Sequence, residues 1–283
     1  MDGQAAAPAA GTVLNALANG TGAAFAIDEY TTATVSLDQS EDIEGAIAED
    51  PEADTALVER CVELVTAEYG DSEGGTVSTE SDVPMASGLK SSSAAANATV
   101  LATLDALDVT DAVSREEAAR IGVEAARNVG VTVTGAFDDA SASMLGGVTV
   151  TDNTTDDLLS REEVDWDVLV WTPPEQYFSA EADVQRCRSI ASMADLVADL
   201  ALDSEYTRAM TVNGLAFCAA LGFSPDPLVE AMDAADGVSL SGTGPSFTAV
   251  GEREALETVR EQWDTREGET WLTTTQTEGA RTP

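Results

Sequence analysis

Histidine is absent from the 283-residue sequence, and lysine occurs once, as Lys90. The absence of histidine excludes Ser-His-Asp and Cys-His catalytic sets, and it excludes every histidine-ligated zinc site. Any acid–base catalysis therefore falls to carboxylates, to Lys90 or to tyrosines. The three cysteines, Cys61, Cys187 and Cys218, are far apart, odd in number and part of helical apolar patterns. We expect them to be reduced core residues.

Positive charge is also scarce. The chain has 13 basic residues against 52 acidic ones, a formal net charge of −39, and the acids are spread along the whole length. Such a surface repels itself at low salt, which indicates a cytoplasmic protein adapted to molar salt. It disfavours nucleic acid as a partner, because phosphates carry the same sign of charge. No apolar run approaches the length of a membrane span, so we expect no membrane partner.

The length and the hydrophobic content of 43% predict a globular protein with a sizeable core, as two compact halves or one large domain. The first half begins with short antiparallel strands within 11–37, followed by an acidic loop at 38–53, a helix at 53–69 and a strand at 76–81. Residues 84–96, called the central loop below, come next. Helices at 94–107 and 116–130 follow, and a strand-like run at 131–134 ends at Gly135.

A buried strand at 165–174 ends in prolines, and we place the boundary between the halves near it. The patterns beyond it are helices over about 179–202, 204–221 and after Pro225, a strand-turn-strand over 238–252, a helix over 253–265 and a last strand near 270–275. This order suggests a split βαβ unit resembling a ferredoxin-like sheet, with helices on one face.

The stretch PMASGLKSSSAAA, residues 84–96, joins a proline, a glycine turn and a serine run to a helix. Ser91, Ser92 and Ser93 are good helix caps, and the first N–H groups of a helix lack partners within it. Those donors form an anion site with the helix dipole, and Gly88 allows a sharp turn there. An ordinary capped helix has the same pattern. No GxxxxGK[ST] loop occurs, which disfavours a P-loop kinase.

Two further elements combine glycine with reactive or polar residues. Adjacent Asp138 and Asp139 follow Gly135 and fit a base and a metal ligand, but they also fit a solvated helix start. Gly242 and Gly244 bracket a threonine, so the backbone there can come close to a ligand or make a plain hairpin turn. The turn at 19–22 leaves the same two alternatives open.

Together the three elements PMASGLKSSSA, GAFDDASASMLGG and SGTGPSF resemble the three motifs of the galactokinase, homoserine kinase, mevalonate kinase and phosphomevalonate kinase (GHMP) superfamily. The first fits the pattern P-x-x-x-G-L-x-S-S-A, after one extra serine. The segments GTVLNALANGTGAAFAID, TVTGAFDDASAS and LSGTGPSFTAV resemble the archaeal shikimate kinases of that superfamily, over nearly the whole chain. The resemblance implies an α+β fold with an ATP-binding half at 1–163, similar to ribosomal protein S5, and a ferredoxin-like half at 164–283.

The resemblance also assigns site residues. It implies that Asp138, with Asp139 as second choice, orients or deprotonates the acceptor hydroxyl. Magnesium would be reached by Ser91 or Ser92, with Glu124 as a weak candidate. The residues implied for ATP binding are Pro84, Met85, Ala86, Ser87, Gly88, Leu89, Lys90, Ser91, Ser92, Ser93 and Ala94. Those implied to support the phosphate loop and line the acceptor are Gly242, Thr243, Gly244, Pro245 and Ser246.

The activity implied is magnesium-dependent transfer of the ATP γ-phosphoryl group to shikimate, giving shikimate 3-phosphate in chorismate and aromatic amino-acid biosynthesis. A related kinase acting on homoserine, mevalonate or a sugar, or a non-catalytic nucleotide-binding module, is the alternative. Arg60 and Arg127 are candidates for the shikimate carboxylate, and the sequence does not choose between them. Lys90 stands where relatives often carry serine, and either the phosphates or solvent would suit it.

Overall fold

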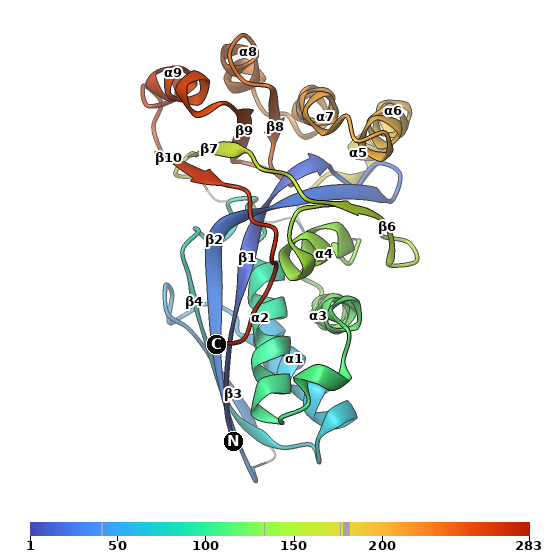
Figure 1. Cartoon of the computed structure of the whole chain (residues 1–283), viewed down its shortest axis with the longest axis vertical. Coiled ribbons are helices and arrows are strands. Elements are labelled where there is room, and N and C mark those ends of the chain that lie inside the picture. The colour runs from blue at the N-terminus through green and yellow to red at the C-terminus, as the bar shows by residue number, and fades with distance from the viewer. Residues whose placement is uncertain (41, 133, 176, 178–181) are drawn as a thin grey trace.

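Two β-sheets, each covered by helices, are stacked along the long axis of the molecule in the computed structural model (Figure 1). The structure describes residues 1–40, 42–132, 134–175, 177 and 182–283. The first sheet is built from the first part of the chain and the second from its last part. The α+β fold that the resemblance implied is confirmed.

The first sheet has six strands in the order β3-β4-β2-β5-β6, and β1 also pairs with β2. The β3 and β4 strands pair in parallel, whereas the other neighbours are antiparallel. Its strands are β1 (Asp2–Leu14), β2 (Thr21–Asp38), β3 (Ile43–Ile47), β4 (Gly74–Ser81), β5 (Val148–Asp152) and β6 (Asp157–Glu162). Alternate residues of β2, Ala33, Val35 and Leu37, are buried, as expected for a strand with one face on a core.

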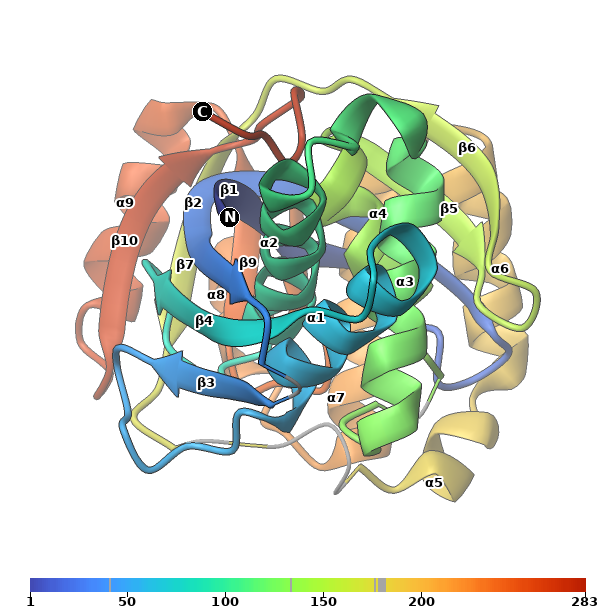
Figure 2. The same ribbon diagram turned by 90° about the horizontal axis from the view of Figure 1, so that it is seen from below.

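Three helices lie against this sheet, namely α1 (Ala56–Tyr69), α2 (Ser91–Ala106) and α4 (Phe137–Leu145). Helix α3 (Arg115–Val129) packs on these three helices, after a 3-10 turn at Thr110–Ala112. Helix α2 runs beside β1 and β2 with α1 and α3 around it (Figures 1 and 2), and its small alanine and threonine side chains are almost all buried. The Ser114 hydroxyl accepts the Glu117 N–H and so caps the start of α3.

The second sheet has the antiparallel order β10-β7-β9-β8. Its strands are β7 (Asp167–Thr172), β8 (Gly237–Leu240), β9 (Phe247–Gly251) and β10 (Glu269–Thr274). The helices α5 (Val184–Arg188), α6 (Ala191–Leu202), α7 (Tyr206–Leu221), α8 (Asp226–Ala231) and α9 (Arg253–Trp263) follow β7 in the chain. Four of these helices, α6 to α9, lie above the sheet in Figure 1.

The chain beyond β10 returns to the first sheet, because Thr275 bridges to Ile27 and Arg281 bridges to Ala6. The C-terminal segment therefore runs down beside β1 and β2, and both termini lie toward the same end of the molecule (Figure 1). A division of the chain at residues 163 and 164 stays a prediction.

Several local predictions were wrong. Residues 38–53, expected as a loop, contain β3, and the helix expected over 179–202 is two helices, α5 and α6. The start of that helix falls on 178–181, outside the described residues. Of the strand-like run 131–134, the described residues 131, 132 and 134 form no strand, and 133 is not described. The prediction for the cysteines is confirmed, since all three are free and buried.

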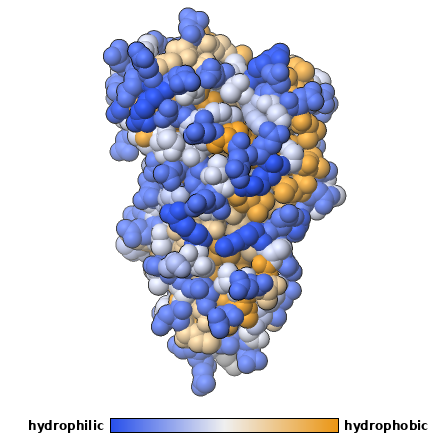
Figure 3. Space-filling model, viewed as in Figure 1, coloured by the Kyte–Doolittle hydropathy of each residue, from blue (hydrophilic) through white to orange (hydrophobic). Residues whose placement is uncertain are grey.

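The surface in Figure 3 is mostly hydrophilic, with apolar patches between the polar side chains, as a net charge of −39 leads one to expect. In the described parts of the chain, no helix combines the length and the apolar character needed to cross a membrane.

Candidate active site

A cavity of about 650 Å³ opens where the central loop, the start of α4 and the loop between β8 and β9 meet. Its polar end is lined by Gly88, Lys90, the serines 91–93, Asp139 and the Gly242-Thr243 turn. Its other walls come from β3, α1 and the end of α3, with apolar side chains such as Ile47, Leu57 and Val123. Glu49, Asp50 and Asp54 also line it. A mostly apolar lining with a few charged groups is typical of a site for a small organic ligand.

The central loop turns into α2 through a backbone that few residues adopt. Gly88 has φ +89°, and a Cβ there would lie 2.3 Å from the carbonyl oxygen of Ser241. Lys90 precedes the helix with φ +66°. The predicted serine cap is wrong: Ser91, Ser92 and Ser93 are the first helical residues, and no described side chain caps the helix. The first residues of α2 line the cavity, and their N–H groups have no capping side-chain oxygen among the described residues.

The loop between β8 and β9 packs against the central loop. The Ser241 hydroxyl donates to the carbonyl of Gly88 at 2.9 Å, and the Ser246 N–H donates to the carbonyl of Ser87 at 3.1 Å. The central loop and the loop between β8 and β9 thus form one wall of the cavity, although Gly88 and Ser241 are 153 residues apart in the sequence.

The ammonium group of Lys90 lies 2.9 Å from Oδ1 of Asp139, and the two side chains are only 8% and 14% exposed. Asp139 lies in the first turn of α4, which begins after Ala136 adopts a left-handed conformation with φ +55°. Apart from this ion pair, Oδ1 of Asp139 has no hydrogen-bond partner within the described part of the chain. The ion pair therefore fixes a carboxylate and an ammonium group together at the wall of the cavity.

Asp138 lies on the other side of α4 and does not line the cavity. Its Oδ1 accepts from Nδ2 of Asn153 at 2.7 Å, and its own N–H donates to Oδ1 of Asn153 at 3.1 Å. A Cβ on Gly22 would come within 2.4 Å of Oδ2, so only glycine leaves room for this carboxyl group. Burial, and next the charge of Asp139, raise the pKa of Asp138 to about 7, although Lys90 and the Asn153 hydrogen bond act in the opposite direction.

Other predicted residues lie away from this cavity or behind its wall. Glu124 is exposed on α3 and does not line the cavity. Arg60 pairs with Glu63 on the surface, and Arg127 pairs with Asp156. Among the residues implied for ATP binding and for support of the phosphate loop, those that do not line the cavity are Pro84, Ser87, Leu89, Ala94, Gly244, Pro245 and Ser246. Those that do line it also include Met85 and Ala86.

Sequence reasoning missed Asn153 and the apolar wall. Asn153 follows β5 in the stretch VTDNTTDD, where nothing distinguishes it from a turn residue. The apolar wall comes partly from β3, which was expected to be a loop. Neither carries a motif, so their place in the site follows only from the fold.

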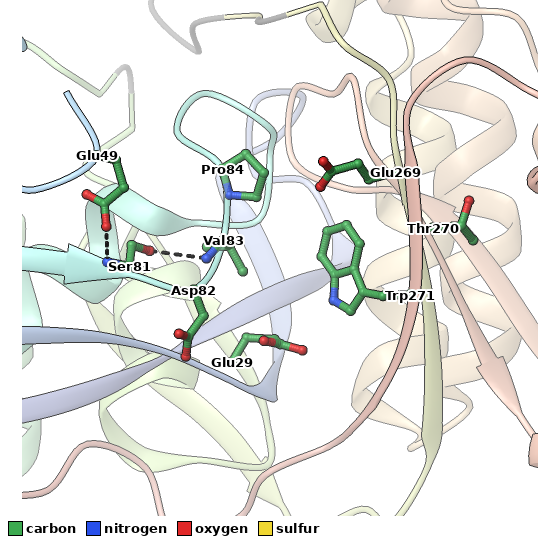
Figure 4. A pocket seen from close by; sticks show the side chains of 9 residues that line it. All are labelled: Glu29, Glu49, Ser81, Asp82, Val83, Pro84, Glu269, Thr270 and Trp271. Atoms are coloured by element: carbon green, nitrogen blue, oxygen red, sulfur yellow. Dashed lines mark hydrogen bonds between the residues drawn. The ribbon is translucent and has the colours of Figure 1, made fainter.

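A second concavity lies beside the first, between β10 and the end of β4. Figure 4 shows its lining, with Trp271 opposite Asp82 and the Glu49 carboxylate accepting the Ser81 N–H. Glu29 and Glu269 add two more carboxylates, and burial raises the pKa of Glu29. In the described residues, no group of three or more acidic or cysteine side chains is arranged to hold a metal ion.

The chain is similar to known proteins. Residues 56–147 match the model of the GHMP kinases N terminal domain. A shikimate kinase of Halobacterium salinarum is 63% identical over 283 residues, which is 100% of both chains. A shikimate kinase of Methanococcoides burtonii is 50% identical over 264 residues, 93% of this chain and 91% of that protein.

Solved structures agree on the fold. The homoserine kinase of Cytophaga hutchinsonii superposes with a TM-score of 0.74 at 17% identity, covering 100% of this chain and 97% of that one. A mevalonate kinase superposes with a TM-score of 0.75 at 14% identity, covering 98% and 100%. At such low identity these likenesses show the fold alone. The full-length identity to the two shikimate kinases goes further, and it shows that this chain belongs to the archaeal, GHMP-type family of shikimate kinases.

Proposed function

We propose that this protein transfers the γ-phosphoryl group of ATP to a ring hydroxyl of shikimate, giving ADP and shikimate 3-phosphate for chorismate and aromatic amino-acid biosynthesis. The observation that carries the proposal is the buried Lys90–Asp139 pair beside the uncapped start of α2. This pair places a cation and a carboxylate together where a phosphate and a hydroxyl would meet. The names of the full-length relatives support the choice of shikimate.

The phosphates of ATP would lie at the start of α2. Backbone N–H groups of the first turn, the helix dipole and the Lys90 ammonium all favour negative charge at that point. Such preorganised donors stabilise the charge that the phosphoryl group carries in the transition state. The nucleoside would extend along the apolar wall that includes Ile47 and Leu57. In a chain of net charge −39, one lysine at this place offsets repulsion of the nucleotide.

Magnesium fits this arrangement as an ion that arrives with the nucleotide. The cavity is lined by Ser91 and Ser92, whose hydroxyl oxygens suit magnesium. Magnesium is usually bound by one or two protein oxygens together with phosphates and water, so no larger protein cage is needed. When bound, the ion would neutralise charge on the β- and γ-phosphates. Glu124 has no part in this proposal.

Asp139 would receive the acceptor hydroxyl. Its carboxylate lines the cavity, held through Oδ1 by Lys90, and would accept the hydroxyl proton while the hydroxyl oxygen attacks the γ-phosphorus. The new oxygen–phosphorus bond forms as the bond to the ADP oxygen breaks, and ADP leaves with that electron pair. Asp138 would support α4 from behind, through Asn153, without contact to the substrate. The Gly242-Thr243 turn would close the wall around the reacting groups.

We place the protein in the cytoplasm, with ATP and shikimate as its ligands and with neither nucleic acid nor membrane as a partner. We also assign residues 1–163 to the nucleotide-binding domain and 164–283 to the second domain.

The test is release of ADP from ATP and magnesium in molar potassium chloride, with shikimate, homoserine, mevalonate or galactose as acceptor. Release that depends on shikimate supports the proposal. Release with another acceptor alone contradicts the assigned substrate, and silence with all four contradicts catalysis. Identification of the product as the 3-phosphate by phosphorus NMR completes the assignment.

A further inference from the structure

The peptide groups on both sides of Gly242 are held by side chains from the far end of the sequence. The Gly242 N–H donates to Oγ1 of Thr12 at 2.7 Å, and its carbonyl accepts from Nδ2 of Asn15 at 2.9 Å. Thr12 lies near the end of β1 and Asn15 directly follows that strand. Both are buried, with 1% and 6% of their surface exposed. The first strand therefore sets the position of Gly242.

Gly242 in turn supports the Lys90 side chain. A Cβ on Gly242 would lie 2.8 Å from Nζ of Lys90 and 3.2 Å from the carbonyl oxygen of Gly88, so the ammonium group packs directly over the glycine. On another side, Nζ contacts Oδ1 of Asp139. A lysine ammonium sits on a flexible four-carbon stem, and its place depends on such neighbours. The Gly242 peptide and the Asp139 carboxylate together define where the positive charge stands.

Asn15 is itself fixed by a buried network. Its Oδ1 accepts the Leu17 N–H at 2.9 Å, and its own N–H donates to Oδ1 of Asn213 on α7 at 3.0 Å. Nδ2 of Asn213 donates to Oγ of Ser239 on β8 at 3.0 Å. Asn213 and Ser239 are fully buried. A buried polar network in which every amide atom is paired holds one geometry, so the Asn15 side chain has a single direction.

We propose that Asn15 is a positioning residue for phosphoryl transfer: its amide fixes the Gly242 peptide, and that peptide fixes the Lys90 ammonium at the reacting end of the cavity. The inference rests on the proposed kinase function. Interactions with a transferring phosphoryl group depend steeply on geometry, and a displacement of about 1 Å can cost a hundredfold in rate. Asn15 therefore acts on turnover without touching a substrate.

The variant Asn15→Asp tests this role. It keeps an oxygen for the Leu17 N–H and replaces the donor to Gly242 with a second oxygen that faces the Gly242 carbonyl. We expect kcat to fall about tenfold or more, while KM for ATP and for shikimate changes less than about threefold, because the lost interaction matters mainly in the transition state. A purely structural role would lower stability and leave the kcat of the folded fraction unchanged.

The matched control is Asn19→Asp, which makes the same chemical change in the same loop. Oδ1 of Asn19 accepts the Thr21 N–H, and its Nδ2 donates to Asp195 on the surface, away from Gly242. We expect this variant to keep wild-type kcat. If Asn15→Asp does not fold, Thr12→Val provides a second variant, because it removes only the acceptor for the Gly242 N–H.

A readout independent of activity comes from Lys90 being the only lysine. Lysine labelled with carbon-13 at Cε gives one NMR signal from the whole chain. We expect this signal to shift in ligand-free Asn15→Asp and Thr12→Val and to stay in place in Asn19→Asp. An unmoved signal in folded Asn15→Asp would overturn the inference, even if that enzyme were slow. A moved signal in a protein that phosphorylates no acceptor would support the positioning of Lys90 and overturn the kinase assignment instead.

Discussion

Replacing Asp138 with asparagine should stabilise the folded protein at alkaline pH. The structure raises the pKa of Asp138 from 3.8 to about 7, chiefly by burial and next by the charge of Asp139. Multiplying this difference by about 1.4 kcal/mol per pKa unit gives a cost of ionising the buried group on the order of 4 kcal/mol. The asparagine side chain of the variant would carry no such charge, and its amide oxygen would still accept from Asn153.

The sign of the pH dependence follows from linkage. Because the folded pKa is above the unfolded value, the folded chain binds more protons between these two values, and stability falls as the pH rises through that window. The cost is fully present above about pH 7 and vanishes near and below about pH 4. Asp138→Asn should therefore gain up to about 4 kcal/mol over the wild type at about pH 8 and much less at about pH 5.

Urea unfolding in molar potassium chloride, followed by tryptophan fluorescence at both pH values, measures this difference. Asp152→Asn is the control of opposite sign, because hydrogen bonds from Thr154 lower the pKa of Asp152 and the charged form is the one favoured. That variant should not gain stability at alkaline pH. Equal gains for Asp138→Asn at both pH values, or a loss at alkaline pH, would refute the reasoning that burial disfavours this charge.

Three further predictions concern the cavity and the surface. Lys90→Met should lower kcat about a hundredfold or more, since it removes the only cation lining the described cavity, and steady-state kinetics with ATP and shikimate checks this. Gly88→Ala should weaken nucleotide binding and lower the melting temperature. Residue 88 has φ +89°, and the added Cβ would lie 2.3 Å from the carbonyl oxygen of Ser241. Calorimetry of ADP binding checks this, and unaltered binding would count against the loop geometry. The melting temperature of the wild type should rise steadily from low salt to molar potassium chloride, because screening weakens the repulsion within a chain of net charge −39. A melting temperature that does not change with salt would contradict adaptation to salt.

The central loop and its following helix could be predicted because their signals are local. A glycine turn, a serine run and an alanine-rich helical stretch follow one another directly in the sequence, so they are close in space without any long-range contact. The start of α3 could be predicted for the same reason, since Ser114 and Glu117 lie within one helical turn of each other. What the sequence could not provide was the direction of each side chain.

The two adjacent aspartates illustrate this limit. Successive residues of a helix point about 100° apart, so the start of α4 decides which carboxylate faces the cavity. That start depends on the left-handed conformation of Ala136, for which the sequence offers no glycine as a signal. Asp138 was the first choice from the sequence, whereas the structure places Asp139 among the lining residues.

The remaining misses depend on contacts between distant parts of the chain. The strand β3 is a five-residue edge strand whose pairing with β4 is parallel, and acidic flanks made its sequence resemble a loop. The bond from Asn15 to Gly242 joins residues 227 positions apart. No local pattern records such a contact, because only the folded chain brings the two residues together.

The most direct test of the account compares the turnover of Asp139→Asn and Asp138→Asn, with shikimate, ATP and magnesium in molar potassium chloride. We expect Asp139→Asn to lose about a hundredfold or more in kcat, whereas Asp138→Asn should stay within about tenfold of the wild type. Circular dichroism of both variants controls for folding. The reverse order, with Asp138→Asn inactive and Asp139→Asn active, would contradict the assignment of the Lys90–Asp139 pair to the reacting centre.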